Sequence, residues 1–72
     1  MAEVEMMAVE SSNVSTIGYN ADEQEIHVEF SNGAEYAYSP CPKEMWEAFQ
    51  AAASKGQFVQ RVLKKQCSAR RV

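Results

Sequence analysis

The 72-residue sequence is poor in the residue types on which metal and redox chemistry depend. It has one histidine, His27, and two cysteines, Cys41 and Cys67, which lie 26 positions apart without a CxxC motif. A tetrahedral zinc site needs about four ligands at characteristic spacing, so we predict no metal site and expect two free thiols. We also predict no cofactor, because a domain of this length buries only about 60% of its unfolded surface and cannot enclose a large one.

Long apolar runs and catalytic motifs are absent as well. No run of about 18 apolar residues is present, and Glu3 and Glu5 make the N-terminus acidic where a secretory signal is basic. We therefore expect a cytoplasmic protein with no membrane contact. The sequence has no G-x-S-x-G motif, Cys-His arrangement or P-loop, so we do not expect an enzyme. With 46% hydrophobic and 24% charged residues, the composition is that of one small globular domain.

Acidic residues are missing from the last third of the chain. Residues 1–47 hold all ten acids and a single base, Lys43, which gives a charge of −9, whereas residues 48–72 hold six bases and carry +6. A basic segment on an acidic body indicates either a surface for nucleic acid or an acidic partner, or a solvated helix face. Both interpretations stay open from the sequence.

Two segments have the pattern of β-strands. Residues 14–19 are rich in β-branched and aromatic residues, and residues 25–30 alternate strictly between apolar and polar side chains. In the second segment, Ile26, Val28 and Phe30 share one face. The opposite face, with Glu25, His27 and Glu29, is expected to be exposed.

The Asn32-Gly33 pair predicts a hairpin whose loop length decides where two tyrosines point. A two-residue loop leaves Tyr36 and Tyr38 opposite the apolar face and therefore exposed. A three-residue loop, with Gly33 in the left-handed conformation, pairs Val28 with Tyr36 and places all the large apolar side chains on one face. We choose the three-residue loop because the burial of two tyrosine rings outweighs the like-charge pair it creates, which costs about 0.2–1 kcal/mol.

Two helices are predicted after the strands. Pro42 suits a first helical position, and residues 43–53 carry an apolar stripe with Trp46 at its edge, either packed on the sheet or exposed as a partner anchor. Ser54 and Gln57 form a capping-box pattern that opens a second helix. Residues 66–72 contain too little apolar surface to pack and are expected to form a mobile tail. The predicted fold class is α+β, a three-stranded antiparallel β-meander followed by two helices packed on one face (β-β-β-α-α).

The start of the second helix is the strongest candidate for a binding site. Gly56 allows a ligand to approach the backbone, and Lys55 adds a positive charge beside the amide groups of the first turn. Arg61, Lys64 and Lys65 extend a basic track that could follow a phosphate backbone. The alternative is plain helix initiation, since the capping box competes for the same amide groups.

The order and spacing of these motifs resemble the KTSC domain family. The resemblance rests on a set of short motifs: Ser11-Ser12, Ile17-Gly18-Tyr19, Val28-x-Phe30, Gly33, Tyr36-x-Tyr38, the helix opened by Pro42, Ser54-Lys55-Gly56 and the apolar-basic last helix. It covers residues 9–66, with residues 1–8 as an N-terminal extension and residues 67–72 as a basic C-terminal tail. The family is named after the C-terminal region of some lysyl-tRNA synthetases and also occurs as small stand-alone bacterial and phage proteins.

What the resemblance implies is modest: RNA binding is suggested for this family largely by its attachment to a synthetase. The positions that match the family's motifs are Tyr36, Tyr38, Ser54, Lys55 and Gly56. The sequence departs from the pattern in having a glutamine at position 60, where asparagine is common, and in its lower basic content.

Two functions follow as hypotheses. The first is a non-catalytic module that contacts RNA or another phosphate-bearing ligand through Lys55, Gly56, Arg61, Lys64 and Lys65. The second is a protein-interaction or regulatory domain without nucleic-acid binding, whose interface includes Trp46 and Glu29. Charge reversal on the second helix distinguishes them, because it weakens only the first kind of binding.

Overall fold

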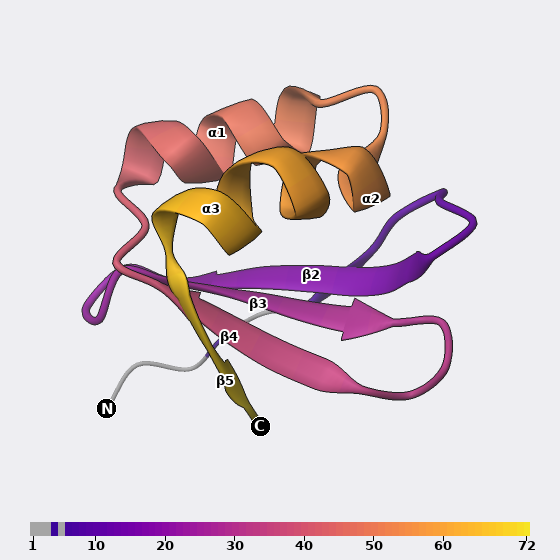
Figure 1. The fold of residues 1–72 in the computed structure, drawn as a ribbon, viewed down its shortest axis with the longest axis horizontal. Helices are drawn as coiled ribbons and strands as arrows, with labels where there is room; N and C mark the ends of the chain where they lie inside the picture. The colour runs from indigo at the N-terminus through magenta and orange to yellow at the C-terminus, as the bar shows by residue number, and fades with distance from the viewer. Residues whose placement is uncertain (1–3, 5) are drawn as a thin grey trace.

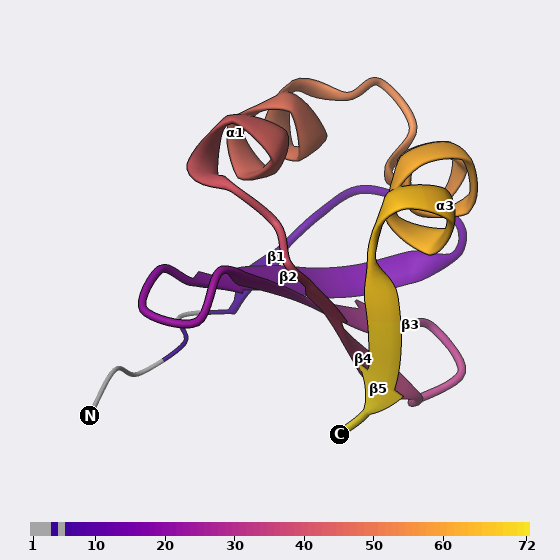
Figure 2. The same ribbon diagram turned by 60° about the vertical axis from the view of Figure 1, so that its left-hand side comes forward.

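The molecule has one layer of strands and one of helices in a computed structural model that describes residue 4 and residues 6–72 (Figure 1). The sheet is antiparallel, with its strands in the order β1-β2-β3-β4-β5. The strands are β1 (Met7–Ala8), β2 (Val14–Asn20), β3 (Glu25–Phe30), β4 (Glu35–Ser39) and β5 (Ser68–Arg71). The helices lie on one side of this sheet (Figure 2). Within the described residues, no helix is long and apolar enough to cross a membrane.

Over the described residues the sheet has five strands, where the sequence predicts three. β1 pairs with β2, and β5 pairs with β4, with Ala69 opposite Tyr38. Both edge strands are exposed and lack an apolar alternation. The expectation of a mobile tail is therefore wrong for Ser68–Arg71, because main-chain hydrogen bonds to a neighbouring strand do not require apolar side chains. Of the predicted N-terminal extension, residues 1–3 and 5 lie outside the described residues.

The hairpin between β3 and β4 has the predicted three-residue loop. Ile26 pairs with Tyr38, and Val28 pairs with Tyr36. Gly33 has a φ of 93°, a left-handed conformation in which a side chain is strained, and its N–H donates to the carbonyl of Phe30 at 2.9 Å. The predicted register is confirmed, and Tyr38 is only 2% exposed.

Two helical segments follow the sheet, as predicted. The first is α1 (Lys43–Ala51), which begins after Pro42. The second runs without a break through α2 (Lys55–Phe58), a π-helical stretch η1 (Val59–Leu63) and α3 (Lys64–Gln66). The Ser54 hydroxyl accepts a hydrogen bond from the backbone N–H of Gln57 at 3.3 Å, so the predicted serine cap is present. The π-helical stretch has no counterpart in the prediction, which follows α-helical periodicity; π-helical turns are rare and occur mostly inside α-helices.

The core lies between the sheet and the helices. It includes Ile26, Val28 and Tyr38 from the strands and Phe49, Val59 and Leu63 from the helices. Trp46 belongs to it too, with an exposed fraction of 9% and its ring stacked on Tyr19 at a centroid distance of 5.5 Å. Trp46 is therefore a central residue of the α1 face, and the helical wheel placed it too far toward the edge.

Candidate ligand-binding site

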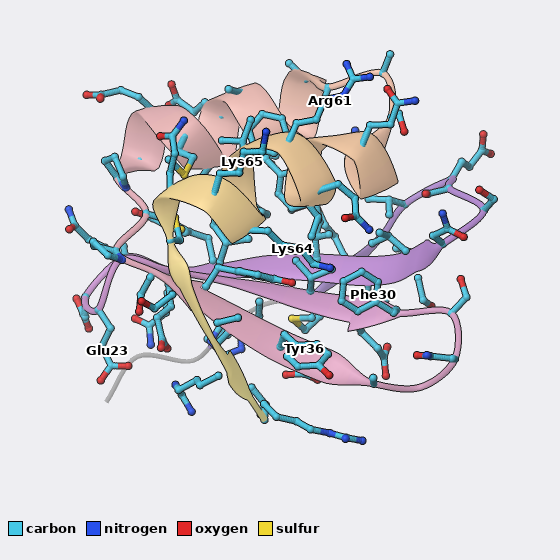
Figure 3. The ribbon with its side chains drawn as sticks, viewed as in Figure 1. Glu23, Phe30, Tyr36, Arg61, Lys64 and Lys65 are labelled. Atoms are coloured by element: carbon cyan, nitrogen blue, oxygen red, sulfur yellow. The ribbon has the colours of Figure 1, made fainter. Side chains whose placement is uncertain are left out.

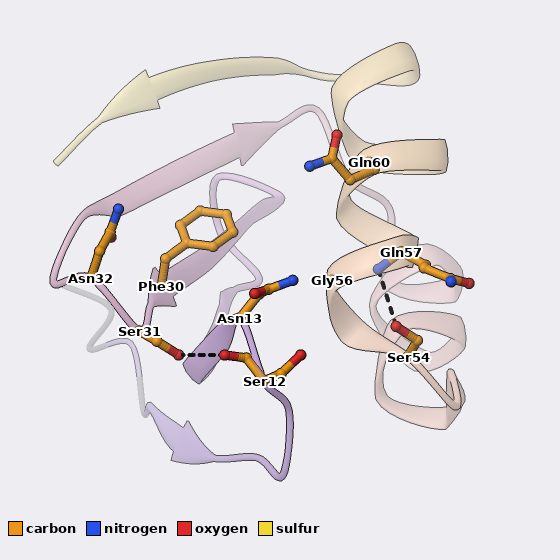
Figure 4. A pocket seen from close by; sticks show the side chains of 9 residues that line it. All are labelled: Ser12, Asn13, Phe30, Ser31, Asn32, Ser54, Gly56, Gln57 and Gln60. Atoms are coloured by element: carbon orange, nitrogen blue, oxygen red, sulfur yellow. Dashed lines mark hydrogen bonds between the residues drawn. The ribbon is translucent and has the colours of Figure 1, made fainter.

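A groove of about 570 Å³ lies where the start of the second helical segment faces two polar loops (Figure 4). Its walls come from three places: the loop before β2, the end of β3 with its turn, and the first turns of the helix. The lining residues are Ser12, Asn13, Phe30, Ser31, Asn32, Ser54, Gly56, Gln57 and Gln60. The volume lies within the range of small-molecule sites, and every lining side chain is uncharged.

Hydrogen bonds fix the two loops against each other. The backbone N–H of Ser31 donates to the carbonyl of Asn13 at 2.9 Å, and the Ser31 hydroxyl donates to the carbonyl of Ser12 at 3.3 Å. The Asn32 side chain accepts from the backbone N–H of Ala34 at 3.0 Å, which stabilises the turn. This side of the groove is therefore held in place before any ligand binds.

The groove contains amide side chains with unused hydrogen-bonding capacity. Within the described part of the chain, no hydrogen bond engages the side-chain amides of Asn13, Gln57 or Gln60. Each such amide offers two donors and an acceptor. In Figure 4 the half-buried ring of Phe30 lies on the sheet side of the groove, with Gln57 and Gln60 of the helix on the other side, and it packs edge-on against Tyr36 at 5.9 Å. The groove can therefore combine directional hydrogen bonds with contact to an aromatic face.

Gly56 brings the helix backbone close to the first loop. A Cβ atom at this position would meet the Asn13 side chain at 3.5 Å, which is ordinary contact distance. A larger side chain would extend from there toward Asn13 and the groove. The predicted role of Gly56, to let a ligand approach the backbone, stays a prediction, because an alanine at this position would fit at ordinary contact distance.

Lys55 is engaged in the fold. Its Nζ donates to the carbonyl oxygens of Gln50 at 3.0 Å and Ala52 at 2.7 Å. These acceptors lie at the end of α1, where backbone carbonyls have no partner within the helix. The prediction that Lys55 binds a phosphate is therefore not supported, since its ammonium group caps α1.

The other predicted cations are exposed but point in different directions. Figure 3 shows Arg61 and Lys65 on the side of the helix that faces away from the sheet, and Lys64 on the side that faces Phe30 and Tyr36. Lys64 lies one turn beyond Gln60, whose side chain lines the groove. The single basic track predicted from the sequence is thus divided, and Lys64 is the cation on the groove side.

The opposite face of the sheet is less exposed than predicted. Glu25 is 5% exposed and His27 is 8% exposed. Arg70 of β5 makes a bidentate ion pair with Glu25, at 2.9 and 3.0 Å. His27 lies 3.4 Å from Glu25 and 3.5 Å from Glu35, and its Nε2 makes no hydrogen bond to the described residues. Because the sequence did not predict β5, it could not predict that Arg70 covers this face.

The ion pair with Arg70 favours the ionised form of the Glu25 carboxyl group. The hydrogen bonds from Arg70 lower the pKa of the Glu25 carboxyl group from its ordinary value, against the opposing effect of burial. Glu25 is therefore charged at neutral pH and neutralised by its partner. The Glu25–Arg70 ion pair therefore has a structural role.

The two residues predicted for the alternative protein interface, Trp46 and Glu29, make contacts within the fold. Trp46 is packed in the core, and Glu29 accepts a hydrogen bond from the Thr16 hydroxyl at 2.9 Å. Neither side chain stands out from the surface as an anchor for a partner.

The two tyrosines of the family motif, Tyr36 and Tyr38, pack against apolar side chains of the fold. Burial raises the pKa of Tyr38, whose ring lies in the core, and Tyr36 is half-buried beside Phe30. Ser54 caps the helix, as described above. Among residue 4 and residues 6–72, no group of three or more histidine, cysteine or acidic side chains could hold a metal ion.

Sequence reasoning missed most of the groove. From the sequence, Phe30 is an apolar strand position and Gln57 belongs to a capping box, and neither Asn13 nor Gln60 is expected to bind a ligand. The one signal that could have indicated them is the presence of polar, turn-forming residues in three segments, Ser12-Asn13, Ser31-Asn32 and Ser54. Only the tertiary fold brings these segments together.

The family model and a solved structure identify the same family. Residues 10–66 match the family model described as the KTSC domain. An uncharacterized protein of Stutzerimonas stutzeri is 38% identical over 60 residues, which span 83% of this chain and 84% of that protein. A protein of Tsukamurella paurometabola is 39% identical over 59 residues, or 82% and 88% of the two chains. The crystal structure of a KTSC domain protein from Yersinia pestis superposes with a TM-score of 0.88 at 30% identity, covering 97% of this chain and 99% of that one.

Proposed function

The chain belongs to the KTSC domain family, and we propose that it is a non-catalytic module that binds a nucleotide-containing ligand, single-stranded RNA, in the groove beside the second helical segment. The observation that carries this proposal is the meeting, in one uncharged groove of about 570 Å³, of an aromatic ring with three side-chain amides that have no hydrogen-bond partner among the described residues.

The chemistry of the groove suits a nucleobase. Amide side chains donate to and accept from base edges, and aromatic rings stack on base faces. The hydrogen bonds to base edges would come from Asn13, Gln57 and Gln60, and the stacking surface from Phe30. Unstacked bases are available in single strands, whereas an RNA duplex has a major groove too narrow for side chains to read and a shallow minor groove that proteins recognise mostly by its shape.

The charges around the groove suit a phosphate. Lys64 lies on the groove side of the helix, with Arg61 and Lys65 farther round the same helix. The acidic turn that contains Glu23 lies at the other end of the sheet from Phe30 (Figure 3). A strand whose base enters the groove therefore meets positive charge at the helix and no acidic side chain among the lining residues.

Fluorescence anisotropy with labelled RNA hexamers tests the proposal. We expect binding that weakens with salt, and the Lys64→Met variant should reduce the slope of log K against log salt by about 0.7, the contribution of one single-strand phosphate contact. The Gln60→Ala variant should weaken binding with little change in that slope. Lys43→Met, which removes an exposed lysine at the start of α1, is the matched control and should behave as the wild type.

Unlabelled mononucleotides, added as competitors, distinguish a free nucleotide from RNA as the ligand. Displacement of the hexamer at micromolar mononucleotide would identify the free nucleotide. Absence of hexamer binding at low salt, or binding that Lys64→Met and Gln60→Ala leave unchanged, would refute the proposed site.

A further inference from the structure

The two cysteines are neighbours in space. Cys41, between β4 and α1, has its Sγ 3.2 Å from the Sγ of Cys67, which follows α3. Both are reduced thiols. Cys41 is fully buried, whereas Cys67 is partly exposed and also contacts the Met45 sulfur at 3.6 Å. The sequence predicts free thiols but gives no sign that they meet, because 26 residues separate them.

We propose that Cys41 and Cys67 are a redox modification site, at which oxidation forms a reversible disulfide that joins the start of α1 to the end of the second helical segment. A disulfide bond is about 2.05 Å long, so the sulfur atoms must approach each other by only about 1 Å. Both residues lie between regular elements, Cys41 after the Pro40 bend and Cys67 before β5, where small backbone adjustments do not break a helix or a strand.

The oxidant is a low-molecular-weight disulfide, and the exchange takes place in two steps. The partly exposed Cys67 loses its proton to solvent, and its thiolate attacks one sulfur of the small disulfide. A mixed disulfide forms and the first small thiolate leaves. Cys41 then loses its proton, its thiolate attacks the Cys67 sulfur, and the second small thiolate leaves. Two protein thiols are oxidised to one disulfide, and the small disulfide is reduced to two thiols that take up the two protons.

The surroundings make the second step the slower one. In the dithiol, burial together with the adjacent Cys67 thiol raises the pKa of Cys41 to about 12. Burial persists in the mixed disulfide and keeps the pKa of Cys41 above its ordinary value, so little thiolate is present at neutral pH. The rate of ring closure should therefore rise with pH through the range from 7 to 10. Cys67, as the accessible partner, determines whether the reaction begins.

The test is equilibration of the reduced full chain with oxidised and reduced glutathione, followed by acid quenching and intact mass spectrometry. The wild type should lose the mass of two hydrogen atoms and resist alkylation at both cysteines. The Cys41→Val variant should stop as a glutathione adduct at Cys67. The Cys67→Ser variant should stay unmodified, since its remaining thiol is buried.

The melting temperature gives a second readout. The cross-link closes a loop of 26 residues, and the oxidised chain should melt roughly 10 °C or more above the reduced chain, with reversal by dithiothreitol. A wild type that accumulates a stable glutathione adduct, forms intermolecular dimers, or remains fully reduced while Cys41→Val is modified would overturn the proposal. Each of these results would show that the buried sulfur cannot complete the bond.

Discussion

The Lys55→Met substitution tests whether Lys55 stabilises the fold or binds a ligand. The Lys55 ammonium donates to two carbonyl oxygens at the end of α1, at 3.0 and 2.7 Å. A hydrogen bond from a charged group contributes about 1.5–3 kcal/mol, and a cation at a helix C-terminus adds about 0.3–1 kcal/mol. Immobilising a lysine side chain costs up to about 2 kcal/mol, and water can solvate the released carbonyls. We therefore expect Lys55→Met to lower the free energy of unfolding by about 1–2 kcal/mol.

Urea denaturation of the Lys55→Met variant measures this loss. The midpoint should decrease with an unchanged m-value, and the melting temperature should fall by roughly 4–8 °C for each kcal/mol. Methionine keeps the aliphatic chain and has a similar helix propensity, so the change isolates the ammonium group. Lys43→Met, at the opposite end of α1, is the control and should not destabilise. Stability within about 0.3 kcal/mol of the wild type, combined with weaker RNA binding, would refute the capping role and restore Lys55 as a ligand residue.

Three further substitutions test the fold and its charges. Trp46→Ala should cost about 3–5 kcal/mol in urea denaturation, because it empties a buried ring site, and a loss below 1 kcal/mol would contradict its place in the core. Gly33→Ala should cost about 1–2 kcal/mol, because its φ of 93° strains any residue with a Cβ, and an unchanged midpoint would argue against the bulged turn. The Arg70→Gln variant should lose stability at pH 7, and this difference should disappear as the pH falls. The reason is that Glu25 has a lowered pKa, so its stabilising effect is complete above the ordinary carboxyl pKa of about 4.3 and is lost as pH falls through the lower folded value. A difference that persists at pH 2 would contradict the ion-pair account.

The central strands and both helices could be predicted because their patterns are local. Alternation in residues 25–30, a glycine at position 33 and a serine at position 54 each specify a short-range geometry that the structure contains. The hairpin register followed from burial energy, since only one loop length put the tyrosines with Val28 on the same face.

The edge strands, the buried acidic face and the groove could not be predicted in this way. β5 pairs through its backbone, and its side chains carry no alternating pattern. Burial of Glu25 depends on Arg70, which is 45 residues away in the chain. The groove depends on three segments that meet only after folding, and the neighbouring cysteines depend on the same long-range packing. Such features follow from tertiary structure, which local periodicity does not encode.

The most direct test of the proposed function is an NMR titration that follows the side-chain NH₂ signals of Asn13, Gln57 and Gln60. These groups lack partners among the described residues and line the groove, so a bound base must perturb them. We predict that a short single-stranded RNA shifts all three signals, together with the backbone amide of Gly56, and that added salt reverses the shifts. Unchanged side-chain signals at saturating RNA, or shifts confined to the face that contains Glu25 and His27, would contradict the account.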